Sequence, residues 1–158
     1  MLELEGILRV LVRHEVEFIV VGGIAAILQG SPLTTDDLDV LYVPAAANCA
    51  RLAEALRELG SRYLDPAGRS IEPTEARLRD LKVHLLKTTL GRIDLLSYLG
   101  DDQVYPDLLG RSQVMEIEDL QVRVLDLDAI IETKEQADRP KDRYQLPFLR
   151  QLAEELRR

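Results

Sequence analysis

Apolar residues follow two different spacings along the 158-residue chain, which predicts a mixture of helices and strands. Leu2, Ile7, Leu8 and Leu11 recur at helical intervals and predict an amphipathic helix over residues 2–15. The same spacing, bounded by Gly and Pro residues, predicts further helices over 24–29, 45–60, 128–137 and 139–158.

Short β-branched or alternating segments predict strands between these helices. They are 17–21, 38–43, a hairpin of 81–88 and 92–99, and one or two strands within 114–127. Residues 61–78 contain Pro66, Gly68 and Pro73, which predicts an irregular connection. The order of elements indicates an α/β (α+β) fold with a mixed sheet flanked by helices. We expect residues 1–158 to form a single domain in which 128–158 is a helical segment that closes over the sheet.

The composition is 46% hydrophobic and 30% charged, which is typical of a soluble globular protein. The net charge of -8 argues against broad nonspecific binding of nucleic acid, although a local basic patch remains compatible with phosphate binding. Cys49 is the only cysteine, which excludes an internal disulfide and suits a reducing compartment. The charged first helix does not resemble a signal peptide, and no apolar run reaches the roughly 18 residues of a membrane span. We therefore expect a cytoplasmic protein that does not bind membranes.

Two carboxylates, Asp37 and Asp39, stand at the start of the second predicted strand. Side chains two residues apart on a strand share a face, so these two project together while Leu38 points into the core. Carboxylates held this closely repel each other unless a cation lies between them, and Mg²⁺ or Mn²⁺ prefers such oxygen ligands. Asp94, alone in an apolar part of a later strand, is a third candidate ligand. The simpler alternative is that the Asp-x-Asp segment only caps or enters the strand.

The order of these features resembles the nucleotidyltransferase superfamily, which has the polymerase beta-like fold. Its signature is a Gly-Gly or Gly-Ser pair, a short helix, Asp-x-Asp and a later acidic residue, matched here by Gly22-Gly23, Asp37-Leu38-Asp39 and Asp94. The tail is similar to the small AbiEii-like and minimal branches, with Lys134 followed by Arg139-Pro140-Lys141-Asp142. The resemblance covers approximately residues 17–150.

Two positions depart from the family pattern. Relatives often carry Arg-x-Thr-x-Asp-hydrophobic-Asp; Thr35 is kept, but Leu33 stands where the Arg is common. Gly23 replaces a Ser found in many active members. Neither change removes a metal ligand, so the resemblance still implies an enzyme, but a slow or selective one.

The resemblance implies transfer of NMP from an NTP, such as ATP, to a hydroxyl on RNA, a protein or a small molecule. Two Mg²⁺ or Mn²⁺ ions would be held by the three aspartates, and Asp94 would accept the proton of the attacking hydroxyl. The backbone N–H groups of Gly22 and Gly23 would cradle the phosphates. Thr35, Lys134, Lys141 and Asp142 would complete the nucleotide site.

Simpler interpretations stay open for several of these residues. Lys134 and Lys141 on amphipathic helices can be merely solvated, and Asp142 near a helix start can be a cap. His84 can line the same cleft, but a hydrogen-bonded strand histidine is favoured. The alternative function is a noncatalytic binding module or the partner of another protein, as in a toxin–antitoxin pair. The three intact carboxylates favour the enzyme.

Overall fold

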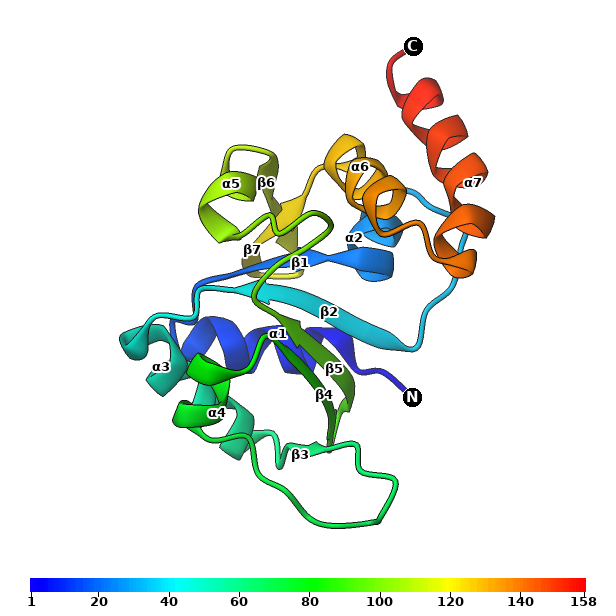
Figure 1. The fold of residues 1–158 in the computed structure, drawn as a ribbon. Helices are drawn as coiled ribbons and strands as arrows, with labels where there is room; N and C mark the ends of the chain where they lie inside the picture. Colours follow the sequence, from blue (N-terminus) through cyan, green and yellow to red (C-terminus); the bar gives the residue numbers. More distant parts are fainter.

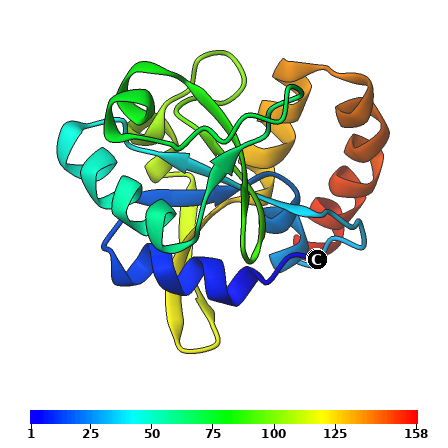
Figure 2. The same ribbon diagram turned by 90° about the horizontal axis from the view of Figure 1, so that it is seen from below.

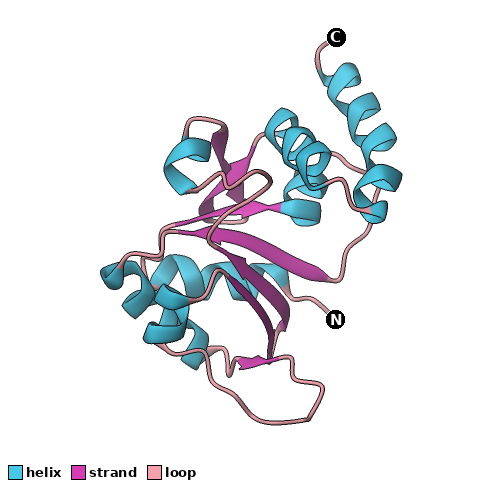
Figure 3. Ribbon diagram, viewed as in Figure 1, coloured by secondary structure: helices cyan, strands magenta, loops and turns pink.

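A mixed sheet of seven strands separates two groups of helices in the computed structural model, which describes residues 1–158 (Figures 1 and 3). The helices are α1 (Leu4–Arg13), α2 (Gly22–Leu28), α3 (Ala46–Glu58), α4 (Glu75–Asp80), α5 (Tyr105–Leu109), α6 (Leu127–Ala137) and α7 (Pro140–Leu156). The strands are β1 (Phe18–Val21), β2 (Asp37–Tyr42), β3 (Arg62–Tyr63), β4 (Val83–Thr88), β5 (Gly91–Leu96), β6 (Ser112–Ile117) and β7 (Leu120–Leu125). The predicted α/β class is confirmed.

The strand order β3-β4-β5-β2-β1-β7-β6 places β1 and β2 at the centre. These two strands are antiparallel, while β5 lies parallel to β2 and β7 lies parallel to β1. The hairpins β4–β5 and β6–β7 form the two flanks of the sheet. Residues of β2 and β5 therefore lie in adjacent rows although about 55 positions of sequence separate them.

Helices α1, α3 and α4 lie on one side of the sheet, and α2, α6 and α7 lie on the other (Figure 1). Figure 2, viewed from below, shows α1 and α3 side by side. The apolar stripe of α1 is fully buried through Ile7, Leu8 and Leu11, as its spacing predicts. No helix has the length and apolar character that crossing a membrane requires.

Most predicted elements occur within a few residues of their expected bounds, but three short ones within 61–109 were not predicted. These are β3, α4 and α5, which have two, six and five residues and so carry too little periodicity to be recognised. The one or two strands predicted within 114–127 are the hairpin of β6 and β7, which spans residues 112–125. Helix α2 begins at Gly22 rather than at residue 24, so the glycine pair opens the helix instead of preceding it.

Candidate active site

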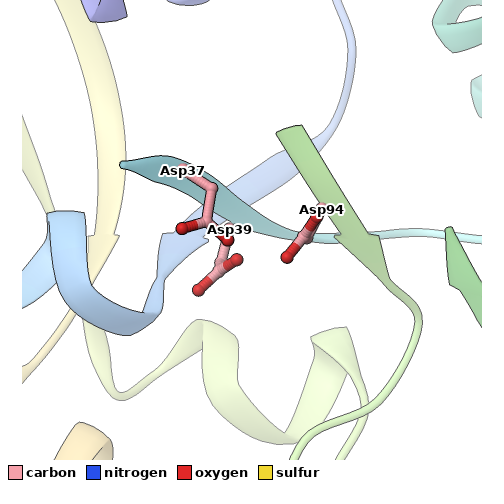
Figure 4. Close-up of side chains that lie close together, drawn as sticks. All are labelled: Asp37, Asp39 and Asp94. Atoms are coloured by element: carbon pink, nitrogen blue, oxygen red, sulfur yellow. The ribbon is translucent and has the colours of Figure 1, made fainter. Parts of the chain in front are cut away.

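Three carboxylates meet where β2 and β5 lie side by side. The parallel register pairs Asp39 directly with Asp94, and Asp37 lies two residues earlier on the same face of β2 (Figure 4). Each carboxylate offers an oxygen within 4.8 Å of the others. Leu38, between the two β2 aspartates, is fully buried on the opposite face. Strand alternation thus places all three acids on one surface and keeps the core apolar behind them.

Glycine is required at position 22 because the backbone there lies very close to the acidic cluster. Its φ of +67° is in the left-handed region that favours glycine. A Cβ at this position would lie 2.3 Å from Oδ2 of Asp39. At Gly23, a Cβ would lie 3.1 Å from Cβ of Thr35. The glycine pair therefore lets the start of α2 approach the carboxylates with no side chain between them.

Thr35 orients the first of the three acids. Its hydroxyl donates to Oδ1 of Asp37 at 3.2 Å and lies 3.4 Å from the Asp37 carbonyl oxygen. On the other strand, a guanidinium nitrogen of Arg92 lies 3.4 Å from Oδ1 of Asp94, but this arginine is substantially exposed. Thr35 is thus placed to fix a carboxylate, in addition to lining the cleft.

The electrostatics of the cluster favour a bound cation. Burial, reinforced by the charge of Asp37, raises the pKa of Asp39 from about 3.8 to about 6. Burial, together with a hydrogen bond to Asp37 and the charge of Asp39, raises the pKa of Asp94 to about 7. A divalent cation among these oxygens would remove the repulsion, so the donor set fits a hard metal ion such as Mg²⁺ or Mn²⁺.

The carboxylates line a cleft of about 360 Å³ whose opposite wall is basic. That wall is built by α6 and by the start of α7 (Figure 1). It carries Lys134, Arg139, Lys141 and the amide side chain of Gln145. Lys134 is only 8% exposed, which excludes the interpretation of this residue as a solvated surface lysine.

Asp142 forms ion pairs with two of these cations, Lys134 and Arg139. It is fully buried and is not among the residues that line the cleft, whereas direct contact of Asp142 with the nucleotide stays a prediction. One oxygen accepts from the backbone N–H and Nε of Arg139, at 3.1 and 2.8 Å, and thereby caps α7. The other lies 3.4 Å from Nζ of Lys134. Burial acts to raise the pKa of Asp142, but the hydrogen bonds from Arg139 and the charge of Lys134 outweigh it and lower the pKa.

Two histidines stand apart from the cleft. His84 projects from the opposite face of the sheet, where its ring lies 3.0 Å from the Tyr42 hydroxyl and 2.5 Å from the Tyr63 hydroxyl. Its place in the core confirms the expectation of a hydrogen-bonded strand histidine. Burial lowers the pKa of this ring. His14 is half-buried and pairs with Glu58, so it too plays no part in the cleft.

Several lining residues were not predicted as site residues. Arg139 belongs to the tail motif, and its spacing from Asp142 is the only signal that marked it in the sequence. Thr133, Gln145 and Tyr98 carry no recognisable motif, because only the folding of α6, α7 and the β5–α5 connection brings them to the cleft.

Comparison with known proteins extends these observations. The fold is similar to that of the lincosamide antibiotic adenylyltransferase LnuA bound to lincomycin, with a TM-score of 0.64, 14% identity, and coverage of 95% of this chain and 96% of that one. It is also similar to ANT(2")-Ia in complex with adenylyl-2"-tobramycin, with a TM-score of 0.61, 18% identity, and coverage of 96% and 86%. A candidate nucleotidyltransferase from Thermotoga maritima (TM1012) has a TM-score of 0.55, 17% identity, and 93% coverage of both chains.

These similarities, all at low identity, confirm the nucleotidyltransferase fold predicted from the sequence. A search of curated protein sequences finds no match. A family model does match, and it spans residues 1–158. The chain therefore belongs to the family described as "nucleotidyl transferase of unknown function (DUF2204)".

Proposed function

We propose that this protein is a metal-dependent nucleotidyltransferase that moves NMP from an NTP to a hydroxyl group of a small molecule. The observation that carries the proposal is the pairing of three carboxylates, within 4.8 Å of one another, with a basic wall across the same cleft. This arrangement suits a triphosphate, whose charge needs cations on both sides. Two fold neighbours, a lincosamide antibiotic adenylyltransferase and ANT(2")-Ia in complex with adenylyl-2"-tobramycin, favour a small-molecule acceptor over RNA or protein.

Each group has a role in this proposal. Asp37, Asp39 and Asp94 would hold two divalent cations, which would neutralise the triphosphate and lower the pKa of the attacking hydroxyl. Asp94, at the edge of the cluster on β5, accepts the proton from that hydroxyl.

The remaining residues position the nucleotide. Lys134 and Lys141 lie on the basic wall and neutralise the β- and γ-phosphates. The N–H groups of Gly22 and Gly23 approach the phosphates closely because no side chain intervenes. Thr35 keeps Asp37 in place.

The bond changes in this reaction balance without a further reactant. The acceptor oxygen forms a bond to the α-phosphorus, and the bond between that phosphorus and the oxygen leading to the β-phosphate breaks. Pyrophosphate leaves from the side of the basic wall, and the hydroxyl proton passes to Asp94. The products are the NMP-modified acceptor and pyrophosphate in equal amounts.

The experiment incubates the full chain with each labelled NTP, Mg²⁺ or Mn²⁺, and fractionated small molecules, RNA and protein. We expect label transfer to a small-molecule fraction, with pyrophosphate released in step. Asp94→Asn should lose transfer at least about 100-fold while it retains NTP binding in a thermal-shift assay. Asp36→Asn is the matched control, because Asp36 is an exposed neighbour of the cluster and not part of it.

Two results would overturn the proposal. Nucleotide and metal binding without transfer to any fraction would identify a noncatalytic binding module. Transfer that Asp94→Asn leaves unchanged would remove the role of this residue as the base.

A further inference from the structure

The wall of the cleft formed by β4 and β5 is apolar and open to solvent. Leu85 is paired with Asp94 across the β4–β5 ladder, and Val83 is paired with Leu96 two residues further along. Val83 and Leu85 are 42% and 44% exposed, although both lie on strands of a seven-stranded sheet. Tyr98 extends the same wall beyond the end of β5. A solvent-exposed apolar surface directly beside a carboxylate of the candidate active site is typical of a surface that binds an apolar ligand.

The charges in the cleft are divided between its two walls. Apart from the three clustered aspartates, no acidic residue lines the cleft. All the cations that line it, Lys134, Arg139 and Lys141, lie on the wall built by α6 and α7. The phosphates of a nucleotide therefore find their partners on one wall only, and the other wall remains for a second substrate.

We propose that Val83, Leu85, Leu96 and Tyr98 bind the acceptor, and that the acceptor is an uncharged small molecule whose hydroxyl projects from an apolar ring or chain. This inference rests on the proposed function of the cleft. An apolar body lying on Leu85 and Val83 brings its hydroxyl to Asp94, because Leu85 is the cross-strand neighbour of that carboxylate. The β4–β5 pairing thus places the bound acceptor beside the Asp94 carboxylate, which takes its proton.

Other acceptor classes lack partners on this wall. A polycation needs acidic groups that are not already committed to a metal, and the cleft offers none. A nucleic acid needs several cations on the acceptor side to hold its phosphates, and the lining residues of β4 and β5 include no basic residue. One cation, Lys82, lies next to this wall, with its Nζ 5.7 Å from the centre of the Tyr98 ring. The overall charge of -8 disfavours nucleic acid further.

The test measures binding separately from transfer. Nile red, an uncharged apolar dye, is titrated into the full chain and then displaced by a panel of neutral alicyclic and aromatic alcohols. Leu85→Ser should weaken dye and alcohol binding at least about tenfold, because the loss of one large apolar contact has that effect. Val114→Ser is the matched control, since Val114 is 51% exposed on β6 at the far end of the same sheet.

A second measurement offers the same neutral alcohols, a polyamine sugar and a short RNA as acceptors, with each variant also assayed for its NTP-dependent melting shift. We expect transfer to the neutral alcohols to exceed transfer to the other two by at least about tenfold and to fall in Leu85→Ser. Preferred transfer to the polyamine sugar or to RNA, or alcohol binding that Leu85→Ser does not change, would overturn the inference while leaving the proposed function intact. Alcohol binding that depends on Leu85 without pyrophosphate release from any NTP would support the apolar site and refute the proposed function instead.

Discussion

Asp39→Asn should make the metal-free protein more stable, although the substitution removes a central residue of the candidate site. Asp39 is pressed against Gly22 on one side and faces Asp94 across the β2–β5 ladder on the other. Burial and the charge of Asp37 both oppose its ionised form. An amide of the same shape keeps the packing and removes the charge, so the unfavourable electrostatic contribution disappears.

The magnitude follows from the pKa of Asp39, which rises from about 3.8 to about 6. Each pKa unit corresponds to about 1.4 kcal/mol, so the ionised side chain costs the fold at most about 3 kcal/mol at neutral pH. Because the neutral amide still has to be buried, we expect a net gain of about 2 kcal/mol. For a chain of this size, that gain corresponds to a rise in melting temperature of about 4–8 °C.

The pH dependence has a definite sign. The folded protein binds a proton at Asp39 more readily than the unfolded chain does, so the wild type is stabilised fully below pH 4 and loses this stability as pH rises through 6. The variant has no such group. The difference in melting temperature between variant and wild type should therefore be large at pH 7.5 and small near pH 4.5. Contributions common to both proteins, such as that of His84, cancel in this difference.

The assay is thermal unfolding of chelator-treated protein at several pH values, with and without Mg²⁺. Wild-type protein should gain stability from Mg²⁺, by about 2.7 kcal/mol at a concentration 100 times the dissociation constant, and Asp39→Asn should gain little. Asp36→Asn, an exposed change of the same chemistry, should behave like the wild type. A variant that is less stable than the wild type at pH 7.5, or that responds equally to Mg²⁺, would refute the assignment of Asp39 as a repelled metal ligand.

Three further predictions concern the support of the site. Gly22→Ala should lower the free energy of unfolding by about 1–3 kcal/mol and weaken Mg²⁺ binding in thermal melts, because φ is +67° and the new Cβ would overlap a carboxylate oxygen. Gly110→Ala is the control and should have neither effect, because no atom lies within 4 Å of its Cβ position. Asp142→Ala should lower the free energy of unfolding by about 3 kcal/mol or more, and it should also lower the affinity for NTP. Asp128→Ala, which breaks an exposed ion pair, should change neither quantity. A loss of stability alone would show that Asp142 is only a helix cap. His84 should titrate below an ordinary histidine in NMR titrations, since burial lowers its pKa, and a ring that titrates at or above 6.5 would contradict its buried position.

The acidic cluster could be predicted from the sequence because it depends on short-range rules. Asp37 and Asp39 share a face through the two-residue period of a strand, and Asp94 stands out between Ile93 and Leu95. The resemblance to a known family supplied the expectation that the three aspartates hold the same metal ions. The parallel register of β2 and β5, which pairs Asp39 with Asp94, is visible only in the structure.

The basic wall could be predicted only in part because it depends on a turn. Asp138 ends α6 in the left-handed conformation, with φ of 49° and ψ of 39°, and α7 then runs back alongside α6. This reversal brings Asp142 to Lys134, eight residues earlier, and buries both. Periodicity along either helix contains no information about the angle between them, so Lys134 and a solvated lysine are indistinguishable in the sequence.

The two walls of the cleft differ in how far the fold itself compensates their buried charges. Lys134 is buried, and burial lowers its pKa, but Asp142 compensates it within the folded chain. The carboxylates of Asp39 and Asp94 lie against each other and against Asp37. The attraction of Lys141 and Lys134 for Asp39, and of the exposed Arg92 for Asp94, is too small to offset burial and mutual repulsion, so both pKa values stay raised. Folding alone therefore compensates part of the basic wall, through Asp142, and leaves the carboxylates repelling one another. A group of charges that the fold does not neutralise needs a ligand of opposite charge, and a nucleotide carried with its metal ions supplies it. On the acidic side of the cleft, the metal ions therefore matter more than the triphosphate. NTP without a divalent cation should bind weakly, because its phosphates would face three aspartates with no cation between them.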